Sequence, residues 1–139
     1  MNTISMILIS LLAGFLSTMN VWVYKVDHMR FHMNDIYMVL LMTSWMILLS
    51  GIQHYYYTNQ IMLIIMSAIS IIVIIYLIRT QTFINNTQFM KGMIPHHSMA
   101  IQMAEKIKEK STNQNVIELA NNIIYSQNKE IALMKQLGY

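Results

Sequence analysis

The sequence predicts an all-α membrane protein with three transmembrane helices followed by a two-helix amphipathic hairpin. Two observations lead to this fold class. Of the 139 residues, 55% are hydrophobic and only 11% are charged, whereas soluble domains average about 25% charged residues. The most apolar residues gather in three long segments in the first part of the chain, and the remainder shows the 3.6-residue periodicity of amphipathic helices.

The three apolar segments cover about residues 3–23, 36–53 and 61–78, and none contains a charged side chain. Each approaches the roughly 20 apolar residues that a helix needs to cross a bilayer. The first segment lacks a preceding basic region and a small-residue cleavage site, so we interpret it as a retained anchor and not as a secretory signal. Gly14 and Gly51 lie inside these segments, where small residues permit close contact between helices.

The last part of the chain predicts two amphipathic helices joined near residues 111–114. Thr82, Asn85 or Asn86 can cap the first helix, residues 111–113 (Ser-Thr-Asn) can end it and cap the second, and Gly138 can stop the second. We therefore expect a three-helix membrane anchor over residues 1–79 and a His/Met helical hairpin domain over residues 80–139. A single hairpin of this size buries too little surface to be stable alone. A homodimer that completes a four-helix bundle, or a higher homo-oligomer, is the expected solution.

Adjacent histidines and spaced methionines are the most informative feature of the hairpin. His96 and His97 lie among Met93, Met99 and Met103 at helical spacing. Imidazole nitrogen and thioether sulfur together suit a soft ion such as copper. The chain has no cysteine, which excludes disulfides and thiolate sites. Two interpretations stay open, because a methionine stripe also fills hydrophobic cores. Adjacent histidines point about 100° apart on a helix, so one of them is expected to enter a given site.

Two further groups of residues are candidates for supporting roles. On the last helix, Gln127, Glu130 and Met134 lie on or beside the apolar face; a polar side chain there can orient a metal-binding imidazole or form a hydrogen bond across the helix pair. In the loop between the first two spans, a repeat at i, i+4 would stack two imidazoles on one helical turn. The repeat consists of His28, Met29, His32 and Met33. These residues are candidate ligands of an accessory metal site, or the repeat arose by chance in a chain with 15 methionines.

Two sequence stretches together resemble a known family. Residues 93–104 read MIPHHSMAIQMA, and residues 119–134 read LANNIIYSQNKEIALM. The pair resembles the family called domain of unknown function 305, over roughly residues 82–138. The resemblance implies an all-helical, bundle-forming domain, and some members of the family bind copper through Met and His. Many members carry the His-His unit twice, whereas this chain carries it once. The three apolar segments resemble a membrane-anchored branch of the family.

The number of spans places the 25–35 loop and the hairpin on the same side of an integral multi-pass membrane protein. All nine Lys and Arg residues lie on that side, which favours a cytoplasmic hairpin by the positive-inside rule. A cysteine-free His/Met copper site suits an oxidising exterior, and the family resemblance implies that side. The orientation is therefore left open.

The first functional hypothesis is a membrane-anchored protein that binds a copper ion, with a role in copper tolerance, buffering or delivery. The alternative is a structural or assembly protein whose hairpin oligomerises without metal. The hairpin contains no nucleophile–base set, phosphate loop or carboxylate pair, so the chain is not expected to be an enzyme. Its short lysine patch lacks interleaved aromatic residues, so nucleic acid is not an expected partner. The expected partners are the lipid bilayer and a second copy of the chain.

Overall fold

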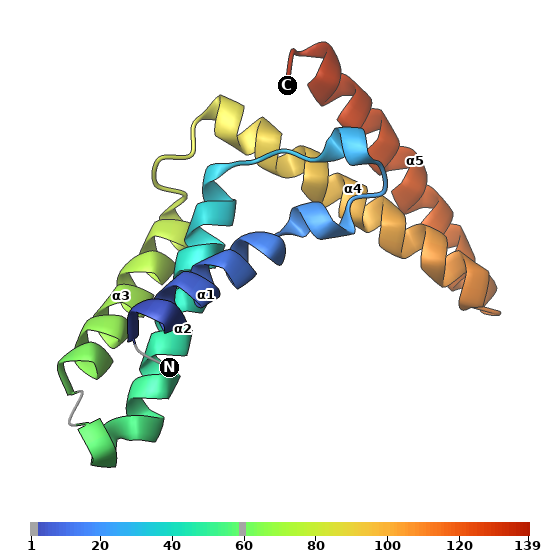
Figure 1. Ribbon diagram of the computed structural model, residues 1–139. Helices are drawn as coiled ribbons and strands as arrows, with labels where there is room; N and C mark the ends of the chain where they lie inside the picture. The colour runs from blue at the N-terminus through green and yellow to red at the C-terminus, as the bar shows by residue number, and fades with distance from the viewer. Residues whose placement is uncertain (1–2, 59–60) are drawn as a thin grey trace. The chain divides into compact units, whose positions relative to one another are not determined.

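The computed structural model describes the backbone of residues 3–58 and 61–139 and the side chains of residues 4–53 and 61–139. All regular structure in these ranges is helical, and they contain no strand, which confirms the all-α prediction (Figure 1). The α-helices are α1 (Thr3–Leu16), α2 (Met33–Thr58), α3 (Ile61–Thr80), α4 (Asn86–Lys110) and α5 (Gln114–Gln136). Two short 3₁₀ helices, η1 (Met19–Trp22) and η2 (Val26–His28), lie between α1 and α2.

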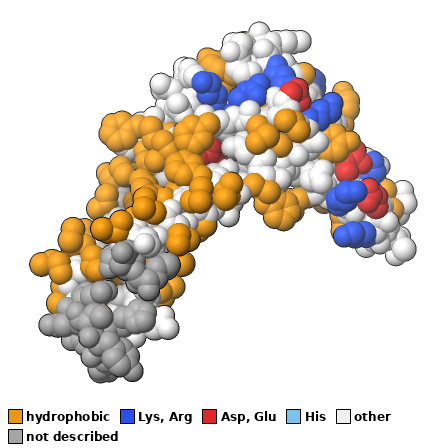
Figure 2. Space-filling view, viewed as in Figure 1, with side chains coloured by type: hydrophobic (Ala, Val, Ile, Leu, Met, Phe, Trp, Pro, Cys, Tyr) orange, Lys and Arg blue, Asp and Glu red, His pale blue; other side chains and the backbone are white. Residues whose placement is uncertain are grey.

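The helices form two compact units. The first contains α1, α2 and α3, and the second contains residues 19–32 together with residues 84–139. On the face drawn in Figure 2, hydrophobic side chains cover much of the described part of the first unit, and Lys, Arg, Asp and Glu side chains gather on the second. The segment that connects α1 to α2 therefore belongs to the hairpin unit, through contacts with α4 and α5.

Three segments are long and apolar enough to cross a membrane, by length and composition: Ile4–Trp22, Met33–Gln53 and Ile61–Thr80. They match the three predicted segments to within a few residues. The first is not one continuous α-helix, because α1 ends at Leu16 and η1 follows it. Asn20 explains part of this break: its side-chain amide donates to the carbonyl of Arg30 at 3.0 Å and accepts the Arg30 N–H at 2.8 Å. These bonds tie the end of the apolar segment to the following loop.

Small residues set the packing of the first unit. A Cβ atom on Gly14 would lie 3.0 Å from Cγ1 of Val39, and one on Gly51 would lie 2.9 Å from Cγ1 of Ile64. The α1–α2 and α2–α3 pairs are therefore in close contact at these two glycines, as expected for helices that pack in a membrane. A hydroxyl pair links α2 to α3 nearby, with Ser44 Oγ 3.0 Å from Ser70 Oγ.

The hairpin begins and ends where its capping residues predict. The side chain of Asn85 accepts the N–H of Gln88 at the start of α4, and that of Asn113 accepts the N–H of Asn115 at the start of α5. Gly138 follows α5 with φ 88°, a left-handed conformation that favours glycine. The two helices enclose a core of Ile94, Ile101, Ile131 and Met134, against which Met90, Met93, Ile124 and Tyr139 pack.

The contact between Gly14 and Val39 can be tested by a substitution in the first unit. Gly14→Val places two methyl groups against Val39 and is expected to cost about 1–3 kcal/mol, the usual range for overpacking. Thermal unfolding in mild detergent measures the change. Leu12→Val, at a side chain that is 62% exposed, is the matched control and should leave the midpoint unchanged. Equal effects of the two substitutions would contradict the close contact.

Candidate functional site

The five predicted ligands on α4 divide into two sets. His96, Met99 and Met103 lie at positions i, i+3 and i+7, which share one helix face. The His96 side chain is exposed, Met99 is half-buried, and Met103 is 59% exposed. Met93 and His97 lie on a different face: Met93 packs against the hairpin core, and His97 is buried. The structure therefore presents one histidine and two methionines to the surroundings and turns the other two residues inward.

His97 is held on both ring nitrogens. Its Nδ1 lies 2.7 Å from the carbonyl oxygen of Met93, and its Nε2 lies 2.7 Å from Oε2 of Glu130 on α5. The first bond spans Pro95, which has no N–H to donate within the helix. The Met93 carbonyl oxygen only accepts hydrogen bonds, so Nδ1 donates to it, and the Glu130 carboxylate lies directly in front of Nε2. Contacts within the hairpin therefore occupy both ring nitrogens of His97.

The supporting residues predicted on α5 have different positions. Glu130 contacts His97 directly, and its side chain is 52% exposed. Met134 belongs to the hydrophobic core of the hairpin, and Gln127 is half-buried. The ring centroid of His97 lies 6.0 Å from that of His96, at an interplanar angle of 80°.

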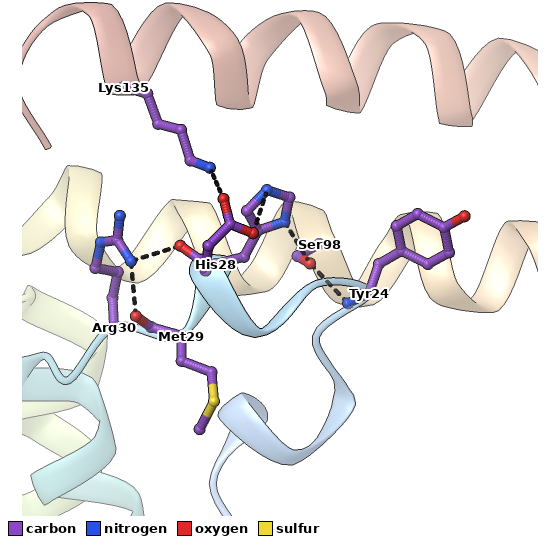
Figure 3. A network of polar contacts seen from close by, with 7 residues as sticks. Tyr24, His28, Met29, Arg30, Ser98 and Lys135 are labelled. Carbon is purple, nitrogen blue, oxygen red and sulfur yellow. Dashed lines mark hydrogen bonds and ion pairs between the residues drawn. The ribbon is translucent and has the colours of Figure 1, made fainter.

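Ser98 joins α4 to the segment that contains η1 and η2 (Figure 3). Its hydroxyl oxygen accepts the backbone N–H of Tyr24 at 2.8 Å and lies 2.9 Å from Nδ1 of His28. The Ser98 side chain is completely buried. These contacts connect positions 70 and 74 residues apart, so the segment between α1 and α2 is a structural part of the hairpin unit.

An ion pair attaches the same segment to α5. Lys135 Nζ lies 2.6 Å from Oδ2 of Asp27, and Asp27 Oδ1 lies 3.7 Å from Nε2 of His28 (Figure 3). The hydrogen bond from Lys135 lowers the pKa of Asp27 below its ordinary value. Burial of the imidazole, followed by repulsion from Lys135, lowers the pKa of His28. At neutral pH the arrangement therefore pairs an ionised Asp27 with Lys135 beside a neutral His28.

The predicted stack of His28 and His32 does not form, and the prediction of a helical turn there is wrong. The 3₁₀ helix η2 ends at His28, and residues 29–32 have no helical structure. His28 reaches Ser98, whereas the ring of His32 lies beside Gly92, so that a Cβ on Gly92 would be 3.4 Å from its Nδ1. Met29 is 47% exposed, and Met33 begins α2 in the other unit. Contacts with α4 replace the local helix and separate the repeat.

Ser98, His28 and Asp27 have the residue types of a nucleophile relay, but their geometry indicates a structural role. The serine hydroxyl has no exposed surface, and the 3.7 Å between His28 and Asp27 exceeds hydrogen-bond length. This network could not be predicted from the sequence, because a serine on an apolar helix face carries no signal of a specific hydrogen-bond partner. Its partners lie 70 or more positions earlier in the chain, and only the fold brings them to it.

The donor types around α4 decide which ions the site suits. Among the described residues, no group of three or more His, Asp and Glu side chains could hold a metal ion. The described residues therefore offer no carboxylate cluster for a hard cation, which needs several oxygen ligands. The donors that share a helix face with His96 are the thioethers of Met99 and Met103, and this donor set fits a soft copper ion.

An apolar groove lies between the last half of α4 and the first half of α5, beside the exposed face that carries His96, Met99 and Met103. Its volume is about 580 Å³, and Met103 belongs to both features. Its other lining residues are Ala100, Ala104, Lys106, Ile107, Lys110, Val116, Leu119, Ala120 and Ile123. Met103 and Leu119 are each 59% exposed, so the groove is lined by large exposed side chains together with the alanines Ala100, Ala104 and Ala120.

The role of Ser98 can be tested through stability. Ser98→Ala leaves the Tyr24 N–H and the His28 ring without their partner, which is expected to cost about 1–3 kcal/mol. Ser126→Ala is the control, because the Ser126 hydroxyl bonds only the Ile123 carbonyl of its own helix in the described contacts. Chemical denaturation in detergent should separate the two variants. A Ser98→Ala protein as stable as the Ser126→Ala protein would show that the network contributes little.

Comparison with known proteins finds a family match that covers the hairpin. Residues 78–138 match the family model described as Domain of unknown function (DUF305). The chain is also 44% identical over 135 residues to the uncharacterized protein L153 of Acanthamoeba polyphaga mimivirus, covering 95% of this chain and 88% of that protein. No solved structure matches the chain. On the match to its hairpin and the similarity along nearly its whole length, the chain belongs to the domain of unknown function 305 family.

Proposed function

We propose that this protein is a membrane-anchored copper-binding protein, in which His96, Met99 and Met103 hold the ion on the exposed face of α4. The observation that carries the proposal is the placement of one exposed imidazole and two methionines at i, i+3 and i+7 of a single helix. His97, which the sequence makes an equal candidate, is engaged by Met93 and Glu130 instead.

The chemistry of these side chains supports copper over harder ions. Thioether sulfur selects soft Cu(I), and imidazole binds it as well. The stretch of α4 from His96 to Met103 carries no carboxylate. The copper-binding members implied by the family resemblance support the same assignment. Binding, tolerance or delivery of copper fits this site better than catalysis, because the buried Ser98 hydroxyl is inaccessible to a substrate.

The location we propose is the bilayer, with the three apolar segments as spans. Their length and composition support this, as does the high hydrophobic content of the whole chain. The 19–32 segment packs in one unit with the hairpin, which supports a shared side for the loop and the hairpin. The copper site then faces the compartment that contains both.

A Cu(I) titration under anaerobic conditions tests this function. The wild type is expected to bind one Cu(I) per chain, and His96→Ala and Met99→Leu/Met103→Leu should each weaken binding by roughly tenfold or more, the loss of at least one metal–ligand interaction. Mg²⁺ and Ca²⁺ should not compete, because they prefer oxygen ligands.

A matched control is available in the anchor. Met62→Leu/Met66→Leu removes two methionines at the same i, i+4 spacing as Met99 and Met103, and their side chains are 66% and 61% exposed on α3. This variant should bind copper like the wild type. Equally weak binding by all four proteins would remove the copper function.

We infer a second role for the hairpin, in assembly, from the groove between α4 and α5. Two helices leave one side of a bundle open, and a second copy of the chain supplies two more. Alternating large side chains and alanines, such as Leu119 beside Ala120, allow two such faces to interdigitate. The proposed assembly is a homodimer whose interface is this groove. The interface would adjoin the proposed copper site, because Met103 lines the groove and is also a proposed copper ligand.

The homodimer is tested by the mass of the detergent-solubilised protein, measured by light scattering with the detergent contribution subtracted. The wild type is expected to be a dimer, and Leu119→Lys should shift it to a monomer by placing a charge on the apolar face. Leu133→Lys is the control, because Leu133 is similarly exposed, at 56%, but lies outside the groove. A monomeric wild type with a folded hairpin would contradict the assembly role.

A further inference from the structure

The two adjacent histidines differ in what faces their ring nitrogens. The His96 side chain is exposed, whereas both nitrogens of His97 contact oxygen atoms at 2.7 Å. The two ring centroids are 6.0 Å apart. A single ion can bridge rings at this separation, since a metal–nitrogen bond is about 2.0 Å long and each ring adds its own radius. Distance therefore does not exclude His97 from the copper site; its hydrogen-bond partners do.

The partners of His97 also indicate which nitrogen could bind. A metal-bound imidazole gives its other N–H to a carbonyl or a carboxylate, which fixes the ring orientation. The carbonyl of Met93 already has this role at Nδ1. Nε2 is thus the nitrogen that could coordinate, and the Glu130 carboxylate lies directly in front of it. Glu130 occupies the position of an ion instead of orienting the ring from behind.

The geometry points to Glu130 as the residue that selects which histidine of the pair binds copper. This inference rests on the proposed function. A hydrogen bond to a carboxylate is about twice as strong as one between neutral groups, so Glu130 competes effectively for Nε2. Cu(I) prefers nitrogen and sulfur to carboxylate oxygen, so Glu130 acts as a competitor and not as a ligand. The wild type then binds copper through His96 alone, with the methionines.

Four proteins form a double-mutant cycle that tests this selection: wild type, His97→Ala, Glu130→Gln and the double variant. Cu(I) affinity is measured by competition with a chromophoric chelator at one fixed pH, and copper X-ray absorption counts the imidazole ligands. His97→Ala should match the wild type. Glu130→Gln should bind about tenfold more tightly, the effect of about 1.4 kcal/mol, with two imidazoles instead of one. The double variant should return to the wild-type affinity and to one imidazole.

Two controls accompany the cycle. Glu118→Gln removes an exposed carboxylate elsewhere on α5 and should leave copper binding unchanged. Glu130→Ala, at a side chain that is 52% exposed, should act in the same direction as Glu130→Gln. Circular dichroism of each variant shows that the helices are intact.

The outcomes separate this inference from the copper function itself. Weaker copper binding by His97→Ala in the wild-type background would overturn it, because His97 would already be a ligand. Weaker binding by Glu130→Gln would also overturn it, because Glu130 would be a ligand. A Glu130→Gln protein with unchanged affinity and one imidazole would do the same. If no variant binds copper, or if His96→Ala binds copper with the wild-type affinity, the proposed copper function itself would be wrong.

Discussion

The hydrogen bonds of His97 hold its ring against α5, and this inward orientation determines which histidine of the adjacent pair is exposed. One bond passes over Pro95 to the Met93 carbonyl, and the other crosses to Glu130 on α5. Because His97 faces inward, its neighbour His96 faces outward on the same turn. Ser98, one residue later, faces the 19–32 segment and binds Tyr24 and His28. Three successive residues of α4 thus lie on its exposed face, at the contact with α5 and at the contact with the loop.

The loop and the two hairpin helices are held together by contacts that differ in strength. The buried hydrogen bonds at Ser98 are costly to break, since they would leave polar groups unsatisfied. The Asp27–Lys135 pair is partly exposed, and exposed ion pairs contribute little. The hydrophobic core of Ile94, Ile101, Ile131 and Met134 supplies the remaining attachment of α5. The exposed face of α4 is therefore held by contacts from both α5 and the 19–32 segment, which is the kind of support that the proposed copper site requires.

Length, periodicity and capping residues were enough to predict the helices. Asn85 and Asn113 act as caps, and Gly138 adopts a positive φ, as their residue types indicate. Periodicity also placed Met93, His96, Met99 and Met103 on one face, but the structure packs Met93 against the hairpin core and leaves His96, Met99 and Met103 together. The sequence could not separate His96 from His97, since their difference depends on Glu130, 33 positions later. The helical turn at His28 and His32 was predicted from spacing alone and is wrong, because long-range contacts with Ser98 and Gly92 determine the conformation there.

The most direct test of which histidine binds copper is the ¹H–¹⁵N correlation spectrum of the histidine side chains, recorded before and after addition of one equivalent of Cu(I). Cu(I) is diamagnetic, so the imidazole signals stay observable. If His96 binds the ion, the signal of one of its ring nitrogens should shift strongly on addition of Cu(I), while the signals of both nitrogens of His97 should stay unchanged. A shift of His97 Nε2 with an unchanged His96 would contradict it.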